Sequence, residues 1–196
     1  MLKIWRDFKL LTLVRGLYKW LAKVLANRLK VVVAKVISKA KNAFVEGRQI
    51  LDAILIANEA IDSILKNKDC VILCKRDIKK AYDYVDWSFL LSVMENWGFG
   101  QKWIEWMKWC ISNARFSVLV NDTSLGFFQS SRGLRQGDPL LPYLFVIAMK
   151  TLSCLFKRVV VRGFLSGCHV RGRGDEGILV SHLLFAYDML VFCEAS

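Results

Sequence analysis

Apolar and polar positions follow a helical period over the first third of the chain and then change to short apolar runs. In residues 18–33 and again in residues 48–66, apolar residues recur every three or four positions, which predicts two amphipathic helices. The apolar face of the first would carry Leu21, Val24, Leu25 and Leu29. That of the second would carry Ile50, Ala53, Ile54, Ala57, Ile61 and Leu65.

A short apolar run at residues 70–74 follows the polar loop 66–69 and leads to Asp77. Because the run is short, uninterrupted and partly β-branched, it predicts a buried strand. Cys70 and Cys74 lie inside it and are interpreted as core residues.

Helices and hairpins are expected to alternate over the remainder of the chain. Helices are predicted at 87–97, where Gly98 ends the pattern, and at 101–114. Residues 116–130 predict a hairpin around the polar turn 121–124. Asp138 followed by Pro139 predicts a capped helix start, with the helix running to about residue 158. A loop or weak hairpin at 163–177 and a strand–turn–strand at 183–192 complete an α+β order, distinct from a regular βαβ array.

Composition narrows the class of protein. The chain has 196 residues, which suits one domain or a large part of one, and 55% of them are hydrophobic, which excludes global disorder. The net charge of +12 favours a polyanionic partner, with nucleic acid first and an anionic membrane surface second. A generic solvated basic surface is the alternative.

Cysteine and histidine usage favours a reducing, intracellular setting without zinc. The six cysteines have no CxxC spacing, and the two histidines are too few for a zinc site. No apolar run is long enough to cross a bilayer, and charged residues interrupt the apolar N-terminus, so neither a membrane span nor a signal peptide is expected.

Two acidic residues, far apart in sequence, each lie at the end of an apolar run. Asp77 follows the first strand, and Asp188 lies at the tip of the C-terminal hairpin. If the two strands are neighbours in one sheet, their carboxylates meet. Phosphoryl transfer to nucleic acid typically uses two divalent ions about 3.5–4 Å apart, and Mg²⁺ prefers carboxylate oxygens. For either residue taken alone, an ordinary strand-end aspartate is the alternative.

Between these two residues, positions 132–140 read RGLRQGDPL. The glycines let backbone approach a ligand closely, and the following helix points its positive end to the same place. Arg132 and Arg135 add charge suited to phosphates. Taken alone, the segment is equally a loop and a helix cap.

The constellation of segments is more specific than any one of them. DIKKAYD at 77–83, RGLRQGDPL at 132–140 and FAYD at 185–188 occur in this order, preceded by ANRL within 22–29 and AFVEGRQI at 43–50. Over essentially its whole length, the chain resembles the reverse transcriptase domain of non-LTR retrotransposons, and most closely plant LINE elements. Intron maturases and telomerase resemble it less.

The resemblance implies the fingers and palm of a right-hand polymerase, with an antiparallel palm sheet flanked by helices. Residues 1–69 would be the fingers-like helical part, and 70–196 the palm with fingers-like insertions. The thumb, the remaining palm strands and an endonuclease are expected to be absent from this stretch. The implied partners are an RNA template, a DNA primer and a dNTP, in the nucleus or cytoplasm and away from membranes.

The resemblance also implies roles for individual residues. Asp77 and Asp188 would bind the catalytic metal, Mg²⁺ or Mn²⁺. Tyr82 would lie under the incoming sugar and exclude a 2′-hydroxyl, and Gln136 with Gly137 would contact the nascent base pair and template. The phosphate-binding candidates are Arg48, Arg132 and Arg135.

Tyr187 departs from the family pattern, which has a metal-binding aspartate immediately before Asp188. A phenol with a reference pKa near 10 is neutral at pH 7 and does not replace a carboxylate. Losing one ligand costs ~4 kcal/mol of transition-state stabilisation, roughly a thousandfold in rate. Further departures at Leu10, Lys39, Lys41 and Leu141 are typical of unselected drift. The sequence thus predicts an impaired or inactive polymerase, with a non-catalytic remnant or a basic nucleic-acid-binding module as the alternative.

Overall fold

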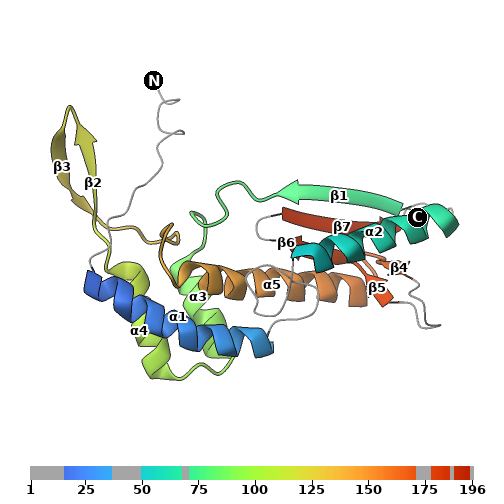
Figure 1. Ribbon diagram of the computed structural model, residues 1–196, viewed down its shortest axis with the longest axis horizontal. Helices are drawn as coiled ribbons and strands as arrows, with labels where there is room; N and C mark the ends of the chain where they lie inside the picture. Colours follow the sequence, from blue (N-terminus) through green and yellow to red (C-terminus); the bar gives the residue numbers. More distant parts are fainter. Residues whose placement is uncertain (1–15, 37–49, 68–70, 171–177, 186–187, 195–196) are drawn as a thin grey trace. The chain divides into compact units, whose positions relative to one another are not determined.

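The computed structural model describes residues 16–36, 50–67, 71–170, 178–185 and 188–194 (Figure 1). The helices are α1 (Gly16–Val36), α2 (Ile50–Asn67), α3 (Trp87–Asn96), α4 (Gln101–Ser112) and α5 (Leu141–Val161). The strands are β1 (Val71–Asp77), β2 (Phe116–Val120), β3 (Thr123–Phe128), β4 (Cys168–Val170), β5 (Ile178–Val180), β6 (His182–Phe185) and β7 (Asp188–Glu194). Helices mix with antiparallel sheets, so the predicted α+β class is confirmed.

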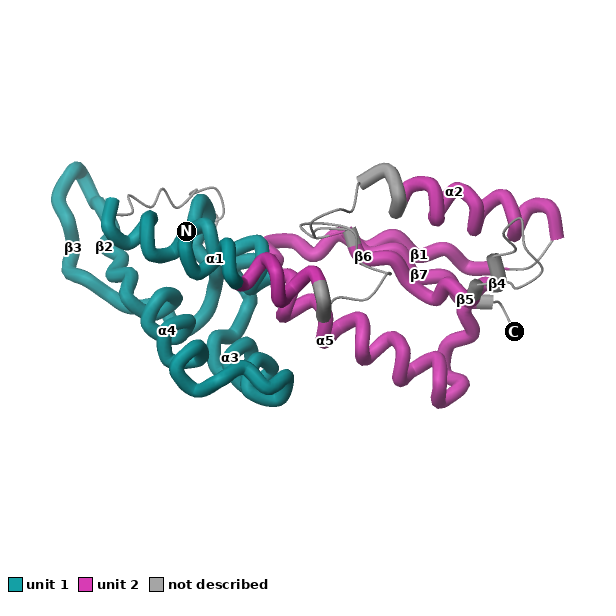
Figure 2. The backbone as a smooth tube through the Cα atoms, turned by 60° about the horizontal axis from the view of Figure 1, so that its bottom comes forward, with its two compact units in different colours: residues 1–28, 82–145 teal, residues 29–81, 146–196 magenta. Residues whose placement is uncertain are grey.

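The chain divides into two compact units (Figure 2). Unit 1 comprises Met1–Arg28 and Tyr82–Phe145, and unit 2 comprises Leu29–Ala81 and Val146–Ser196. Both units are discontinuous in sequence, whereas the predicted division at residue 69 is sequential. The assignment of 1–69 and 70–196 to fingers and palm stays a prediction.

Unit 2 is built on a three-stranded antiparallel sheet of order β1-β7-β6, beside the separate hairpin β4–β5. Helix α2 packs against β4 and β6. Its contact face carries the buried Ala57 and Ala60, flanked by the partly buried Ile56 and Ile64. The core cluster consists of Ala57, Ala60, Cys168, Val180, Leu183 and Phe192.

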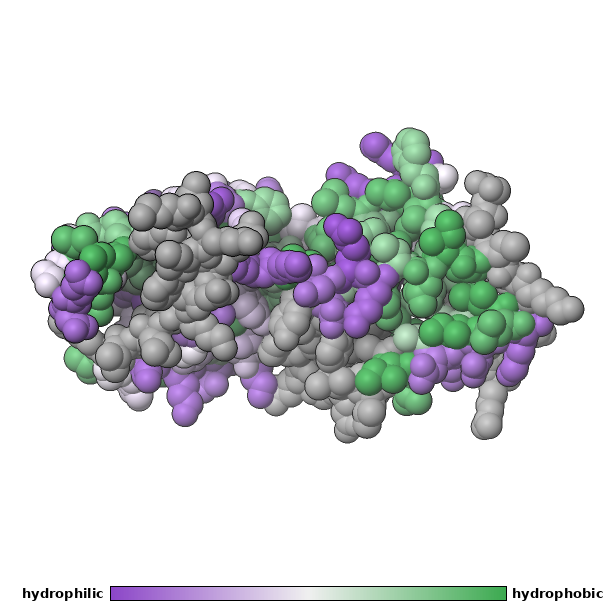
Figure 3. Space-filling view, turned by 90° about the horizontal axis from the view of Figure 1, so that it is seen from above, coloured by the Kyte–Doolittle hydropathy of each residue, from purple (hydrophilic) through white to green (hydrophobic). Residues whose placement is uncertain are grey.

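Strand β1 is exposed along nearly its whole length, so the prediction of a buried strand is wrong. The side chains of Ile72 and Leu73 are 59% and 43% exposed, and Cys74 is exposed rather than in the core. Within the described sheet β1 is bonded to β7 only, which makes it an edge. A short apolar run does not reveal whether its strand has neighbours on both sides. Hydrophobic residues lie at the surface over this part of unit 2 (Figure 3); Cys70 lies outside the described residues.

The helices occur where the periodicity predicts them, but their buried faces are rotated. In α1, Leu25 and Leu29 are buried as expected, whereas Leu21 is exposed. In α2, Ile54 and Leu65 are exposed. The positions that are buried instead include small residues, namely Ala22, Ala26 and Ala60. The spacing of large apolar residues therefore predicts where the helices lie, but the buried face is the one that carries the alanines.

Two further boundaries differ from the sequence prediction. The β2–β3 hairpin closes through Asn121 and Asp122, whose φ values of 49° and 60° suit a type I′ turn, so β3 begins at Thr123. Helix α5 begins at Leu141, three residues after the predicted cap. Asp138 instead closes a turn, because its Oδ1 accepts a hydrogen bond from the Leu140 amide at 2.9 Å. No described helix is both long and apolar enough to span a membrane.

His182 is a buried polar residue at the start of β6, with only 3% of its surface exposed. Its ring nitrogens are hydrogen-bonded to hydroxyl groups, Nε2 with Ser153 at 2.8 Å and Nδ1 with Ser181 at 3.0 Å. The ring of Phe156 stacks on it at 4.9 Å. Burial, and secondarily the positive charge of Lys157, lower the pKa of His182 to about 4.

This buried histidine predicts an acid-sensitive fold. Because the pKa is about 4 in the folded chain and 6.5 in the reference state, the unfolded chain takes up the proton first as pH falls. Neutral His182 contributes on the order of 2–3 kcal/mol to the unfolding free energy. This contribution is fully present above pH 6.5 and is lost as the pH falls from 6.5 to about 4. Urea unfolding at a series of pH values measures it. His182→Gln should remove this component; an unchanged pH profile in this variant, compared with the natural chain, would contradict the assignment.

Candidate functional site

The register of the unit 2 sheet pairs Asp77 with Asp188. They are direct partners at the ends of β1 and β7. Residues directly opposite in an antiparallel pair share a face, with Cβ atoms about 4.5–5.5 Å apart. The two carboxylates predicted from separate apolar runs are therefore cross-strand neighbours.

Strand β6 fixes the other side of Asp188. Phe185 is the cross-strand partner of Asp188, so only residues 186 and 187 connect β6 to β7. A two-residue connection is the commonest hairpin form. Tyr187, the predicted defect, is one of these two residues and lies outside the described residues, so its role stays a prediction.

Among the described residues, Asp77 and Asp188 are not part of a larger group of metal ligands. Across the described parts of the chain, no three His, Cys, Asp or Glu side chains are grouped to hold a metal ion. Asp77 is exposed and Asp188 half-buried, so both are accessible from solvent. Carboxylates of this kind suit Mg²⁺, which commonly binds through one or two carboxylates together with substrate phosphates.

In unit 1, the loop of residues 132–140 is held by backbone hydrogen bonds to the segment after β1. The Gly133 amide donates to the Val85 carbonyl and the Leu134 amide to the Tyr82 carbonyl, both at 2.8 Å. The Trp87 indole donates to the Gly133 carbonyl at 2.7 Å. The segments carrying Tyr82 and Gln136 are thus joined through the backbone.

Gly133 is required where these segments meet. Its φ is +92°, and a Cβ atom there would lie 3.2 Å from the carbonyl oxygen of Asp83. Both the positive φ and the close approach disfavour a side chain at this position. One glycine of the RGLRQGDPL segment therefore serves packing against a neighbouring loop.

The residues predicted to bind nucleotide and template differ in how exposed they are and in what they contact. Tyr82 is half-buried, with its ring edge-to-face on Phe145 at 4.6 Å. Arg132 is exposed, its guanidinium 5.6 Å from the Tyr84 ring centroid, and Gln136 and Gly137 are exposed at the turn. Arg48 lies outside the described residues.

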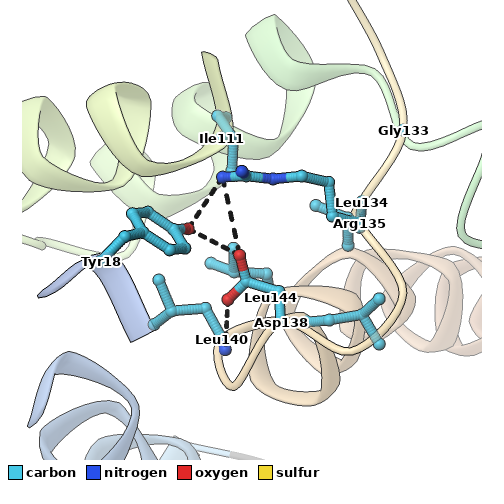
Figure 4. A pocket seen from close by; sticks show the side chains of 9 residues that line it. Tyr18, Ile111, Gly133, Leu134, Arg135, Asp138, Leu140 and Leu144 are labelled. Carbon is cyan, nitrogen blue, oxygen red and sulfur yellow. Dashed lines mark hydrogen bonds and ion pairs between the residues drawn. The ribbon is translucent and has the colours of Figure 1, made fainter. Parts of the chain in front are cut away.

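Arg135 is largely committed to partners within the protein (Figure 4). Its Nη2 donates to the Tyr18 hydroxyl at 2.8 Å, to Asn113 Oδ1 at 3.1 Å and to the Cys110 carbonyl. It also lies 3.6 Å from Asp138 Oδ2. The predicted phosphate contact of Arg135 would have to compete with these bonds, whereas the exposed guanidinium of Arg132 faces no such competition from a buried network.

Tyr18 was not among the residues singled out by sequence. It lies on the buried face of α1, and its hydroxyl donates to Asp138 Oδ2 at 2.6 Å. Burial, and then the nearby Asp138 carboxylate, raise the pKa of Tyr18 far above its usual value. The same two causes raise the pKa of Cys110 to about 11. A tyrosine on an apolar helical face signals that its hydroxyl needs a partner, but the sequence does not say which one.

Residues 5–196 match the family model described as reverse transcriptase (RNA-dependent DNA polymerase). Since the match covers nearly the whole chain, the chain belongs to the reverse transcriptase family. Its relatives include proteins of non-LTR retrotransposons, which confirms the predicted class; the narrower plant assignment stays a prediction.

Two relatives and one solved structure illustrate the similarity. The transposon TX1 uncharacterized 149 kDa protein of Xenopus laevis is 28% identical over 99% of this chain and 15% of its own length. A retrovirus-related Pol polyprotein from the type-1 retrotransposable element R2 of Nasonia vitripennis is 28% identical over 60% of this chain and 10% of its own. The chain thus spans a small part of these relatives. The structure of telomerase from Candida albicans, in complex with a fragment of telomeric RNA, shares the fold with a TM-score of 0.57 at 11% identity, covering 89% of this chain and 30% of that one.

The close approach at Gly133 predicts a position-specific loss of stability. Gly133→Ala should lower the unfolding free energy by about 2–4 kcal/mol, because it adds a steric contact to the strain of a positive φ. Gly98→Ala is the matched control, since Gly98 has φ +80° with nothing within 4 Å of an added Cβ. That control should lose only about 1 kcal/mol in chemical denaturation. Equal losses would show that the Asp83 contact does not matter.

Proposed function

We propose that this chain is part of an RNA-directed DNA polymerase of the LINE type and that this copy is catalytically impaired. The observation that carries the proposal is the pairing of Asp77 with Asp188 at the ends of β1 and β7, in a chain of the reverse transcriptase family. The polymerase reaction is attack of a primer 3′-hydroxyl on the α-phosphorus of a dNTP, forming the new phosphodiester bond and releasing pyrophosphate.

Asp77 and Asp188 are the residues that would hold the divalent ion, Mg²⁺ or Mn²⁺. Their oxygens are hard ligands, they come from adjacent strands, and they are open to solvent from which phosphates approach. Held by these two carboxylates, such an ion would supply positive charge to the phosphates and would favour the deprotonated 3′-hydroxyl.

Tyr187 is the reason for proposing impairment. In the resembling family the residue before Asp188 is a third carboxylate, and here it is a neutral phenol. With two carboxylates in place of three, the site has one negative charge fewer with which to bind divalent ions during the reaction. Two ions close together need that charge, so two-ion catalysis should suffer more than binding of a single ion.

Nucleic-acid binding does not depend on the missing carboxylate. The net charge of +12, and the exposed Arg132 beside the exposed turn at Gln136 and Gly137, support binding of an RNA template paired to a DNA primer. A protein that binds this hybrid without extending it is the second candidate function, and Tyr187 is the feature that favours it.

Restoring the carboxylate should restore activity. Tyr187→Asp is expected to raise single-nucleotide extension of a DNA primer on an RNA template with Mg²⁺ by roughly a thousandfold over the natural chain. Asp77→Asn in the Tyr187→Asp background is the control and should remove the gain. Equal extension by the natural chain and Tyr187→Asp would contradict the impairment; no extension by either, despite hybrid binding, would favour the non-catalytic module.

Binding should be strongly salt-dependent and should involve Arg132. The affinity for a short RNA–DNA hybrid, measured by fluorescence anisotropy from 50 to 300 mM salt, should fall linearly on a log–log plot. Arg132→Gln is expected to reduce the slope by about one. Arg162→Gln removes the same charge just beyond the end of α5 and serves as the charge-matched control. Equal slopes for these two variants would remove Arg132 from the interface.

A further inference from the structure

The exposed residues Gln136 and Gly137 form the tip of a tight turn. The Asp138 amide donates to the Arg135 carbonyl at 3.2 Å, and Gly137 has a φ of +81°. A hydrogen bond from residue i+3 to residue i, with a positive φ at i+2, is typical of a type II turn. The tip faces solvent, whereas the side chains of the two corner residues, Arg135 and Asp138, are only 10% and 8% exposed.

Both corner side chains converge on the hydroxyl group of Tyr18 (Figure 4). That oxygen accepts from Arg135 Nη2 at 2.8 Å and donates to Asp138 Oδ2 at 2.6 Å. The two charged groups are themselves 3.6 Å apart, and the guanidinium carbon lies 4.7 Å from the Tyr18 ring centroid. One hydroxyl therefore bridges the first and last residues of the turn.

Tyr18 connects this turn to the helices of unit 1. It belongs to α1, and its ring packs against Trp109 of α4 at a centroid distance of 6.2 Å. Asp138 extends the network toward α5, because its Oδ1 accepts a hydrogen bond from the amide of Leu140, the residue before that helix. The turn is thus held by polar contacts with the Tyr18 hydroxyl of α1 and the Cys110 carbonyl of α4.

We infer that Tyr18 is a positioning residue for the Gln136–Gly137 turn. This inference deepens the proposed function and rests on it for the role of the turn in contacting template and incoming nucleotide. Without the Tyr18 hydroxyl, Asp138 Oδ2 loses its shortest hydrogen bond and Arg135 loses an acceptor, in a place from which water is largely excluded. The corner side chains then separate more easily, and the tip between them samples more conformations.

Tyr18→Phe tests the bridge directly because it keeps the ring on which Arg135 lies. Tyr143→Phe is the matched control: this half-buried tyrosine in unit 1 has no side-chain hydrogen bond among the described residues. NMR amide exchange is followed at Asp138 and Leu140, whose N–H groups close the turn. We expect exchange at these two amides to be about tenfold faster in Tyr18→Phe and unchanged in the control. Exchange as slow as in the control would overturn the inference.

A second variant separates local from global effects. Asp138→Asn weakens the same bridge from its other end and should also accelerate exchange at the Leu140 amide. Amides in the middle of α4 report global opening and should stay unchanged in both variants. If they accelerate by the same factor as the turn, Tyr18 only stabilises the fold and the positioning role is rejected.

A functional measurement uses the protein bound to an RNA–DNA hybrid. Tyr18→Phe should lower the affinity for the complementary dNTP about tenfold while leaving the affinity for the hybrid within about twofold. General destabilisation would lower both. If Tyr18→Phe lowers the affinity for the hybrid but not the affinity for the dNTP, the positioning of the turn by Tyr18 is contradicted. If the natural chain does not bind the hybrid at all, the proposed function fails, and amide exchange alone still decides whether Tyr18 holds the turn.

Discussion

The pairing register of β1 with β7 is the constraint on which the candidate site depends. Side chains alternate between the two faces of a strand, so a slip of one residue would move one aspartate to the opposite face. The observed register runs without interruption from Val71 opposite Glu194 to Asp77 opposite Asp188. Leu73 opposite Phe192 lies on the same face, and Phe192 is fully buried in the core cluster. The burial of Phe192 thus fixes which face of β7 carries Asp188, and the uninterrupted register brings Asp77 directly opposite it.

In unit 1, polar contacts rather than strand pairing hold the loop that carries the exposed residues Arg132 and Gln136. Its loop 132–140 is held by backbone bonds to residues 82–87 and by the buried side chains of Tyr18, Arg135 and Asp138. These are polar interactions in a place with little water, where each partner is costly to leave unpaired. Gln136 and Arg132 are therefore exposed, as the proposed binding requires, while the neighbouring residues Arg135 and Asp138 hold the loop.

The sequence predicted the elements and the acidic pair because those signals are local. Asp77 follows an apolar run, Asp188 sits at a hairpin, and helical periodicity marks α1 and α2 within a few residues. What it missed depends on contacts between distant segments. The exposure of β1 reflects which strand lies beside it, and the burial of Arg135 reflects a tyrosine more than a hundred positions away. The start of α5 was misplaced for the same reason, since Asp138 uses one oxygen for Tyr18 and the other for Leu140 instead of capping the helix from its predicted position.

The exposed edge of β1 has a consequence for self-association. An open strand offers unpaired backbone groups to a second copy, and apolar side chains at such an edge favour aggregation. In β1, however, Lys75 and Arg76 follow directly after Ile72, Leu73 and Cys74. Two copies paired antiparallel about Cys74 would set Lys75 against Leu73 and Arg76 against Ile72, and two copies paired parallel in register would set like charges side by side. Both of these arrangements are unfavourable, so Lys75 and Arg76, which precede Asp77, act against them.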